Sequence, residues 1–453
     1  MRHPRAGTPH RGPRELVDPA VVRARVLLTG LFGLNGLMYA SQLARLPSIR
    51  DALEVSPAQL GLMLLAASVG SLGTILVAGA IVTRFGARAA LTAAALGFLA
   101  SYVLLGLGTH LAHVPLVLAG FLLSGASFAV GNVPLNVESS RIERRYGRTI
   151  LPQFHAAFSI GAVVGSLLGA GAAGLGMTVL TQFLLVAAVC TGVRLWSIPS
   201  VVLDRSADEI AAAELAVSGA RALPAAATGD ESAEPTVQEI AGPPVSRFRA
   251  ALGSWTERRT LLIGLIVFAA ALSEGSAYDW LSIAVVDGFA QTEAVGGVAF
   301  GLFVGAMTAM RLAGTRLIDR YGGVTVLRLS GVVSVVGLLL FGFAPRFEVA
   351  AAGIVLWGFG AALAIPIGIA AVSEEPLKAA GRVAVVSAFS SIASLAAPPL
   401  LGFAAEHVGI RHALVLIVVG MVISVTLSRQ VAPTRTATVA DEARGRAPEE
   451  VPA

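Results

Sequence analysis

The sequence predicts an all-α membrane protein in which twelve transmembrane helices form two pseudo-symmetric six-helix bundles. Composition is the first observation. The 453-residue chain is 55% hydrophobic and 13% charged, whereas soluble domains contain roughly 25% charged residues. The second observation is a set of twelve apolar stretches, each near the roughly 20 residues that an α-helix needs to cross a bilayer. The third is a charged turn that occurs twice, about half a chain apart.

The predicted helices divide into two sets of six. The first set covers residues 26–46, 58–81, 89–108, 112–137, 152–174 and 177–199. The second covers residues 260–286, 294–315, 324–344, 347–372, 383–405 and 410–428. Residues 201–259 are rich in Ala, Pro and Glu and are predicted to be a flexible linker. The predicted domains are a basic cytoplasmic N-terminus (1–25), an N-terminal bundle (26–200), the cytoplasmic linker (201–259), a C-terminal bundle (260–429) and a disordered cytoplasmic tail (430–453).

Basic residues give the orientation of the predicted helices. With both termini and the linker in the cytoplasm, the external turns contain only four of the 33 Lys and Arg residues: Arg45, Arg50, Arg346 and Arg411. The other 29 of the 33 are assigned to the cytoplasmic side or to cytoplasmic helix ends, which is the asymmetry of the positive-inside rule. Topology therefore explains the net charge of +5, and we expect no nucleic-acid partner. The expected location is the cell (plasma or inner) membrane.

Several function classes are disfavoured by motifs that the sequence lacks. No GxxxxGK[ST] loop occurs, because the only lysine, Lys378, lies in EEPLKAAG, so ATP-driven pumping is not expected. No group of His, Cys and carboxylate residues has metal-ligand spacing. The only cysteine, Cys190, cannot form an intrachain disulfide. We expect a protein that is not an enzyme and that holds no cofactor or metal.

The repeated turn is GTRLIDRYGG, from Gly314 to Gly323, and its looser copy GAIVTRFGAR begins at Gly79. The step between the two is 235 residues, and the same offset relates Gly125 to Gly360. Six spans followed by a long linker and six more spans are typical of parallel repeats related by an axis along the membrane normal.

On these features the chain resembles the major facilitator superfamily over nearly its whole length. GTRLIDRYGG looks like the signature turn of that family between helices 8 and 9. Two further stretches, NVPLNVESSRIERRYGRTILPQFHAAFSIGA (Asn132–Ala162) and SEGSAYDW (Ser273–Trp280), resemble a bacterial branch related to proton-coupled fucose permeases. The sequence departs from these patterns at Thr83, where an acidic residue is usual, and at Asn132, where the branch more often has Asp.

The resemblance implies a gate on the cytoplasmic face, because arginines and an aspartate of the signature turn bridge helix ends in the family. The residues expected to form it are Arg84, Arg88, Arg316, Asp319 and Arg320. An outer gate is predicted from the repeat. Arg45 and Asp279 occupy nearly equivalent external helix ends in the two halves, and we expect them to approach each other when the outer mouth closes.

Glu274 is the predicted proton-coupling residue. It lies about 21 Å into the helix that starts near Thr260, and an ionisable group at that depth normally faces a cavity or a partner. Tyr278 follows at i+4 and shares its face. The alternative is a carboxyl group that only fixes helix packing.

Further polar side chains are candidates for lining a substrate cavity. Asn35, Tyr39 and Gln42 form one stripe at helical spacing, either for hydroxylated cargo or for interhelical hydrogen bonds. Asn132 and Asn136 flank Pro134, and they either bind cargo or satisfy the backbone that the proline disrupts. Trp357 either stacks on a sugar or packs in the core.

The predicted function is secondary active transport of a small polar solute, such as a sugar, by alternating access with proton coupling. Two alternatives remain open. One is efflux of amphipathic drug-like compounds by proton exchange, and the other is a membrane sensor or assembly partner that transports nothing. The expected partners are a small-molecule substrate, protons and the lipid bilayer. The oligomeric state is open, with a monomer as the expectation.

Overall fold

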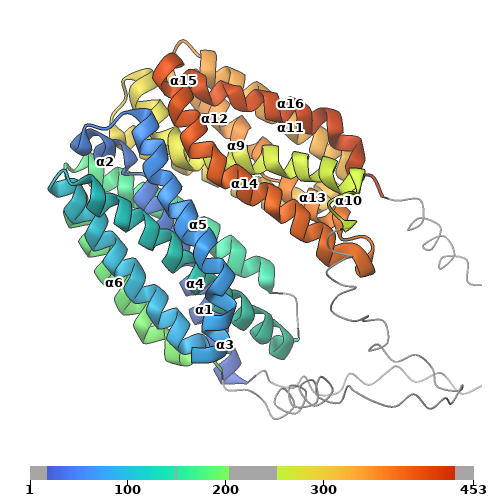
Figure 1. Ribbon diagram of the computed structural model, residues 1–453, viewed down its shortest axis with the longest axis horizontal. Helices are drawn as coiled ribbons and strands as arrows, with labels where there is room; N and C mark the ends of the chain where they lie inside the picture. The colour runs from blue at the N-terminus through green and yellow to red at the C-terminus, as the bar shows by residue number, and fades with distance from the viewer. Residues whose placement is uncertain (1–17, 148–149, 204–252, 434–453) are drawn as a thin grey trace, which may run out of the picture.

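The computed structural model describes residues 18–147, 150–203 and 253–433, and these residues form helices and turns with no strand. The N-terminal half contains α1 (Pro19–Leu43), α2 (Leu46–Leu53), α3 (Pro57–His110), α4 (Val114–Tyr146), α5 (Leu151–Gly174) and α6 (Val179–Val201). The C-terminal half contains α9 (Arg258–Phe289), α10 (Glu293–Tyr321), α11 (Gly323–Phe343), α12 (Phe347–Ala361), α13 (Ala364–Val372), α14 (Pro376–Val408), α15 (Ile410–Ala413) and α16 (Ile417–Leu427). The all-α prediction is confirmed (Figure 1). Most of the predicted basic N-terminus, linker and tail lies outside the described residues.

Eleven helical segments of the described chain are long and apolar enough to cross a membrane. The predicted number was twelve, and the difference arises in α3, which contains the predicted spans 58–81 and 89–108 in one 54-residue helix. The two parts meet at Gly86, whose φ of 85° and ψ of 162° break the helix. A chain that reverses direction there crosses the membrane twice.

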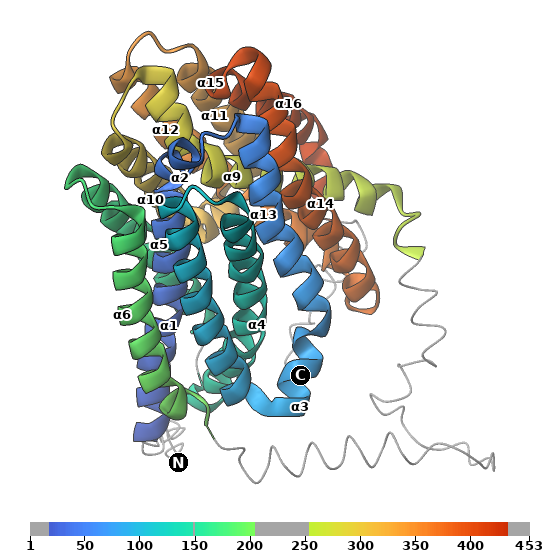
Figure 2. The same ribbon diagram turned by 60° about the vertical axis from the view of Figure 1, so that its left-hand side comes forward.

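The helices of both halves run between the same two ends of the molecule. We call the first the α2 end; it contains α2 and the starts of α6 and α10. We call the second the linker end, and it contains the start of α1, the end of α6 and the start of α9. Figure 2 shows α1 running from the linker end to α2, with the kinked bottom of α3 at the linker end.

Helix starts at the α2 end follow from capping residues in the sequence. Ser56 caps α3 in a capping box with Gln59, where each side chain bonds the backbone of the other. The side chains of Thr178 and Thr292 accept hydrogen bonds from the backbone N–H groups of the third residues of α6 and α10. Such caps satisfy backbone N–H groups that have no partner inside the helix, so these boundaries are fixed locally.

The two halves meet through α3 with α14 and through α5 with α10. The closest approach of α3 and α14 is at the α2 end. A Cβ atom on Gly61 would lie 2.4 Å from the carbonyl oxygen of Pro398, and one on Gly402 would lie 2.5 Å from that of Pro57. Only glycine permits backbones to pack this closely. Figure 1 shows the halves together near α2 and α15 and diverging toward the linker end.

Candidate functional site

A cavity of about 540 Å³ lies between the two halves. Its walls come from α1, α3, α4 and α5 on one side and from α9, α13 and α14 on the other. Eight hydroxyl groups line it, those of Tyr39, Ser68, Ser71, Ser124, Tyr278, Ser390, Ser391 and Ser394. The amide of Gln42 and the carboxyl groups of Glu274 and Asp279 complete the polar lining. Volumes of this size are typical of pockets for small molecules.

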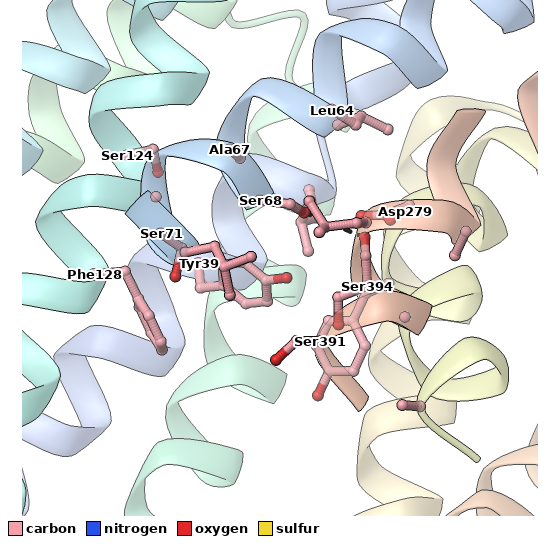
Figure 3. A pocket seen from close by; sticks show the side chains of 18 of the residues that line it. Tyr39, Leu64, Ala67, Ser68, Ser71, Ser124, Phe128, Asp279, Ser391 and Ser394 are labelled. Carbon is pink, nitrogen blue, oxygen red and sulfur yellow. Dashed lines mark hydrogen bonds between the residues drawn. The ribbon is translucent and has the colours of Figure 1, made fainter. Parts of the chain in front are cut away.

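Two tyrosines from opposite halves meet in the cavity. The rings of Tyr39 on α1 and Tyr278 on α9 have centroids 5.7 Å apart and are tilted by 38°. Phe128 supports Tyr39 at 6.1 Å, and Phe300 packs edge-on against Tyr278 at 5.3 Å. Figure 3 shows Tyr39, Ser71 and Phe128 on one side of the cavity and Asp279 on the other.

Glu274 forms an ion pair with Arg311 of α10. Arg311 Nη2 donates to Glu274 Oε2 at 2.8 Å, and Arg311 Nε donates to the carbonyl oxygen of Ala362 at 3.3 Å. The Glu274 side chain is 19% exposed and the Arg311 side chain 36%. A carboxylate within an apolar span is therefore balanced by a cation that its neighbouring helix supplies, and it remains accessible from the cavity.

Asp279 also lines the cavity, which corrects its predicted position at the outer gate. Within the described chain, no hydrogen bond or ion pair joins its carboxylate to a protein group. The lining positions 271, 274, 275, 278 and 279 of α9 follow helical spacing, so one face of the helix presents both carboxyl groups.

Arg45, the other predicted outer-gate residue, joins the two halves with a different partner. It pairs with Glu293 at the start of α10, with 3.3 Å between Nε and Oε1 and side chains that are 4% and 17% exposed. On its own half, Arg45 donates to Gln182 Oε1 at 2.6 Å and to the carbonyl oxygen of Met177 at 3.0 Å. Ser48 donates to both Glu293 oxygens through its N–H and its Oγ, at 3.0 and 2.6 Å. The arginine faces α10 because α2 and α6 fix its orientation.

Two further polar contacts cross between the halves at the α2 end. Arg50 of α2 forms an ion pair with Asp287 of α9. Ser56 Oγ donates to Glu406 of α14 at 2.5 Å. Together with the Arg45–Glu293 pair they connect α2 and the start of α3 to three helices of the other half, so this end is closed.

The linker end is open in the same structure. All five predicted residues of the cytoplasmic gate are exposed: Arg84, Arg88, Arg316, Asp319 and Arg320. Arg88 donates to the carbonyl oxygen of Val202 at 3.0 Å, within its own half. Among the described residues, no ion pair joins Asp319 to another helix, so the latch stays a prediction for the closed linker end.

A separate contact at the linker end links two helices of the C-terminal half. Arg382 of α14 donates to Glu257 Oε2 at 2.5 Å, just before α9 begins. This hydrogen bond holds the pKa of the Glu257 carboxyl group below its usual value. The start of α9 is thereby tied to α14.

Four predicted cavity residues lie elsewhere in this structure. Asn35 is 4% exposed and accepts a hydrogen bond from Arg194 of α6 at 2.5 Å. Trp357 is fully buried and donates to Ser273 Oγ at 2.8 Å. Asn136 donates to the backbone and side-chain oxygens of Asn132, at 2.8 and 3.0 Å. All four make contacts inside one half, whereas Tyr39, Gln42 and Tyr278 line the cavity.

Some site residues were missed in the sequence although a signal was present. Ser387, Ser390, Ser391 and Ser394 have the i, i+3, i+4, i+7 spacing of one helix face, and the last three line the cavity. Arg194 and Arg311 were assigned to cytoplasmic helix ends, but they lie within membrane spans. Charged residues inside apolar spans are functional candidates, and this test would have found Arg311.

Comparisons with known proteins agree with this architecture. The family model described as Major Facilitator Superfamily matches residues 263–450. The chain is 28% identical over 381 residues to "Uncharacterized transporter y4wD" of Sinorhizobium fredii (strain NBRC 101917 / NGR234), covering 84% of this chain and 90% of that one. Among solved structures, it resembles the nucleoside transporter NupG with a TM-score of 0.65 and 14% identity, over 90% of this chain and 98% of that one. A variant of the E. coli fucose:proton symporter FucP gives a TM-score of 0.56 and 15% identity, over 92% and 100% of the two chains.

Proposed function

We propose that the chain is a membrane transporter of the major facilitator superfamily, the family that its C-terminal half matches, and that it carries a small hydroxylated solute by alternating access. The observation that carries this proposal is the cavity at the junction of the halves, to which both contribute hydroxyl groups. Hydroxyl groups donate and accept hydrogen bonds, so they match a polyhydroxylated cargo. The structural neighbours include a nucleoside transporter and a fucose:proton symporter, whose names are consistent with such a cargo.

The linker end is assigned to the cytoplasm. Arg84, Arg88, Arg316 and Arg320 are exposed there, and the positive-inside rule favours this side for basic residues. On this assignment both termini are cytoplasmic. The described conformation is then open to the cytoplasm and closed to the outside by the Arg45–Glu293 and Arg50–Asp287 pairs.

Proton coupling is assigned to Glu274. Its carboxylate is 19% exposed and lines the cavity, so a proton can reach it from the open side. Protonation would remove the charge that balances Arg311, leaving the guanidinium without its carboxylate partner. Because an uncompensated charge in an apolar span is unfavourable, the two helices would rearrange with the protonation state.

The test is transport by the purified full-length protein in proteoliposomes. Sugars, polyols and nucleosides are screened by competition for counterflow, with and without a pH gradient. We expect at least one hydroxylated solute to be exchanged and to be accumulated when the gradient is imposed. Replacing two serines of the α14 face in one variant (Ser390→Ala with Ser394→Ala) should weaken the binding of that solute several-fold. Ser373→Ala, on the exposed end of the neighbouring segment, is the control. Absence of exchange for every solute class would reject the proposal.

A further inference from the structure

The two carboxyl groups of the cavity differ in their protein partners. Glu274 is balanced by Arg311 at 2.8 Å. Asp279 has no such partner among the described residues, although its side chain lines the cavity. The lining residues include no Lys, Arg or His. With the Glu274–Arg311 pair neutral as a unit, the cavity has one negative charge in excess when Asp279 is ionised.

We propose that Asp279 binds a protonated amino group on the cargo, so that the transported solute is a hydroxylated amine. This inference rests on the proposed function and deepens it, because it specifies a class within the hydroxylated solutes. An ionised carboxylate in a membrane span needs a compensating charge. The protein supplies one to Glu274 and none to Asp279, and a cationic cargo supplies the missing charge. An anionic cargo is disfavoured by the same excess charge.

The surroundings of Asp279 match an ammonium group rather than a proton alone. An ammonium group donates up to three hydrogen bonds and accepts none. The cavity that Asp279 lines also contains the hydroxyl oxygens of Ser68 and Tyr39 and the side-chain oxygen of Gln42. The tilted rings of Tyr39 and Tyr278 present aromatic faces, which attract cations. A proton carrier would need none of these acceptors.

The depth of Asp279 gives the cargo an orientation. The α9 helix runs from the linker end to the α2 end, so Asp279 lies five residues, or about 7.5 Å, deeper than Glu274 from the open side. Figure 3 shows Asp279 on the same side of Ser394 as Leu64, which lies near the start of α3. The amine of a cargo that enters from the open end therefore reaches the closed end first, and its hydroxyl groups face the serines of α14.

Matched solutes test this inference on the wild-type protein. Aminosugars, aminocyclitols and amino alcohols are each compared with their N-acetyl or hydroxyl counterparts, for example D-glucosamine with N-acetyl-D-glucosamine and D-glucose. Binding to the purified full-length protein is measured by thermal shift and by competition in counterflow. We expect the amine of a recognised pair to bind at least ten-fold more tightly than its neutral counterpart. N-acetylation should remove this advantage, because it removes the positive charge.

Variants of Asp279 complete the test. Asp279→Asn should abolish the preference for the amine while leaving the weak binding of the neutral counterpart within about three-fold of wild type. Asp279→Glu should keep the preference, and Glu348→Gln, at an exposed glutamate of α12, should leave all affinities unchanged. Equal or tighter binding of neutral solutes by the wild type would overturn the inference and leave the proposed function standing. So would an unchanged amine preference in Asp279→Asn. If no solute, charged or neutral, binds or competes in counterflow, the proposed function and this inference are both overturned.

Discussion

Glu274 and Arg311 lie on adjacent helices of the C-terminal half and neutralise each other inside the membrane. Glu274→Gln removes the titratable group and keeps the size of the side chain. We expect counterflow of cargo to persist within a few-fold of wild type and accumulation driven by a pH gradient to be lost. Both are measured in the same proteoliposomes, and Glu348→Gln, at an exposed position of α12, is the control. Accumulation by Glu274→Gln at the wild-type level would show that another residue carries the coupling proton.

Among the described residues, Arg45 and Glu293 form the most buried ion pair that connects the two halves. Removing one member of a buried pair leaves the other uncompensated, at a cost of roughly 3–5 kcal/mol. Since Glu293 is 17% exposed, we expect about 3 kcal/mol, or roughly a hundred-fold shift away from the conformation that is closed at the α2 end. Spin labels at the exposed positions Ala52 and Ala290 should report a longer distance in Arg45→Gln.

The double variant Arg45→Gln, Glu293→Gln provides the control for that prediction. It leaves no uncompensated charge, so its shift should be smaller than that of Arg45→Gln alone. Equal shifts in the single and double variants would show that the two charges are not coupled.

At the scale of the helix, the sequence predicted where each span lies but not which way each face points. The predicted span 152–174 corresponds to α5, Leu151–Gly174, which has a proline in its first turn and is followed by Gly176 with a φ of 68°. Lipid and protein interior are both apolar, so a helix that is apolar all round carries little information about its rotation. Asn35 and Tyr39 share a predicted stripe, yet Asn35 contacts Arg194 and Tyr39 faces the cavity. Such contacts depend on the neighbouring helix.

The α3–α14 contact makes a prediction about closure. Gly61→Ala places a methyl group 2.4 Å from the Pro398 carbonyl oxygen, so one backbone must move away. We expect the α2 end to open and the distance between labels at Ala52 and Ala290 to increase. Gly73→Ala, on the same helix with nothing within 4 Å of the added carbon, should leave the distance unchanged. An unchanged distance in Gly61→Ala would mean that this contact does not hold the α2 end closed.

The charged turn after α10 gives a prediction for the other end. Asp319 is exposed in the described conformation, and we expect it to bridge to a neighbouring helix only when the linker end closes. Asp319→Asn should therefore increase the fraction of molecules that are open at the linker end and reduce the rate of transport. Thr83→Ala, in the N-terminal copy of the turn, should have a smaller effect because Thr83 carries no charge. The comparison uses initial rates of counterflow, and equal, negligible effects would argue for a purely topological role of the turn.

At the scale of the whole molecule, duplication and composition were sufficient to predict two sets of membrane-spanning helices, because both are properties of the chain as a whole, whereas the superfamily was inferred from the resemblance of the charged turn. The charges that connect the halves were harder to predict. Arg45 pairs with Glu293 rather than Asp279 because α2 turns it toward α10. The 235-residue offset of the repeat relates positions along the chain and does not predict the direction of a side chain. The Asp279 carboxylate is left in the cavity, where it acquires its proposed role.

In the proposed transport cycle, one cavity opens alternately at the two ends of the molecule. The most direct test measures two distances in the same protein by electron–electron double resonance, after the buried Cys190 is replaced by alanine. One label pair is at Ala52 and Ala290 at the α2 end, and the other is at Ala89 and Tyr321 at the linker end, all exposed. Addition of a transported solute should lengthen the first distance and shorten the second. No change in either distance, or a change of both in the same direction, would contradict alternating access.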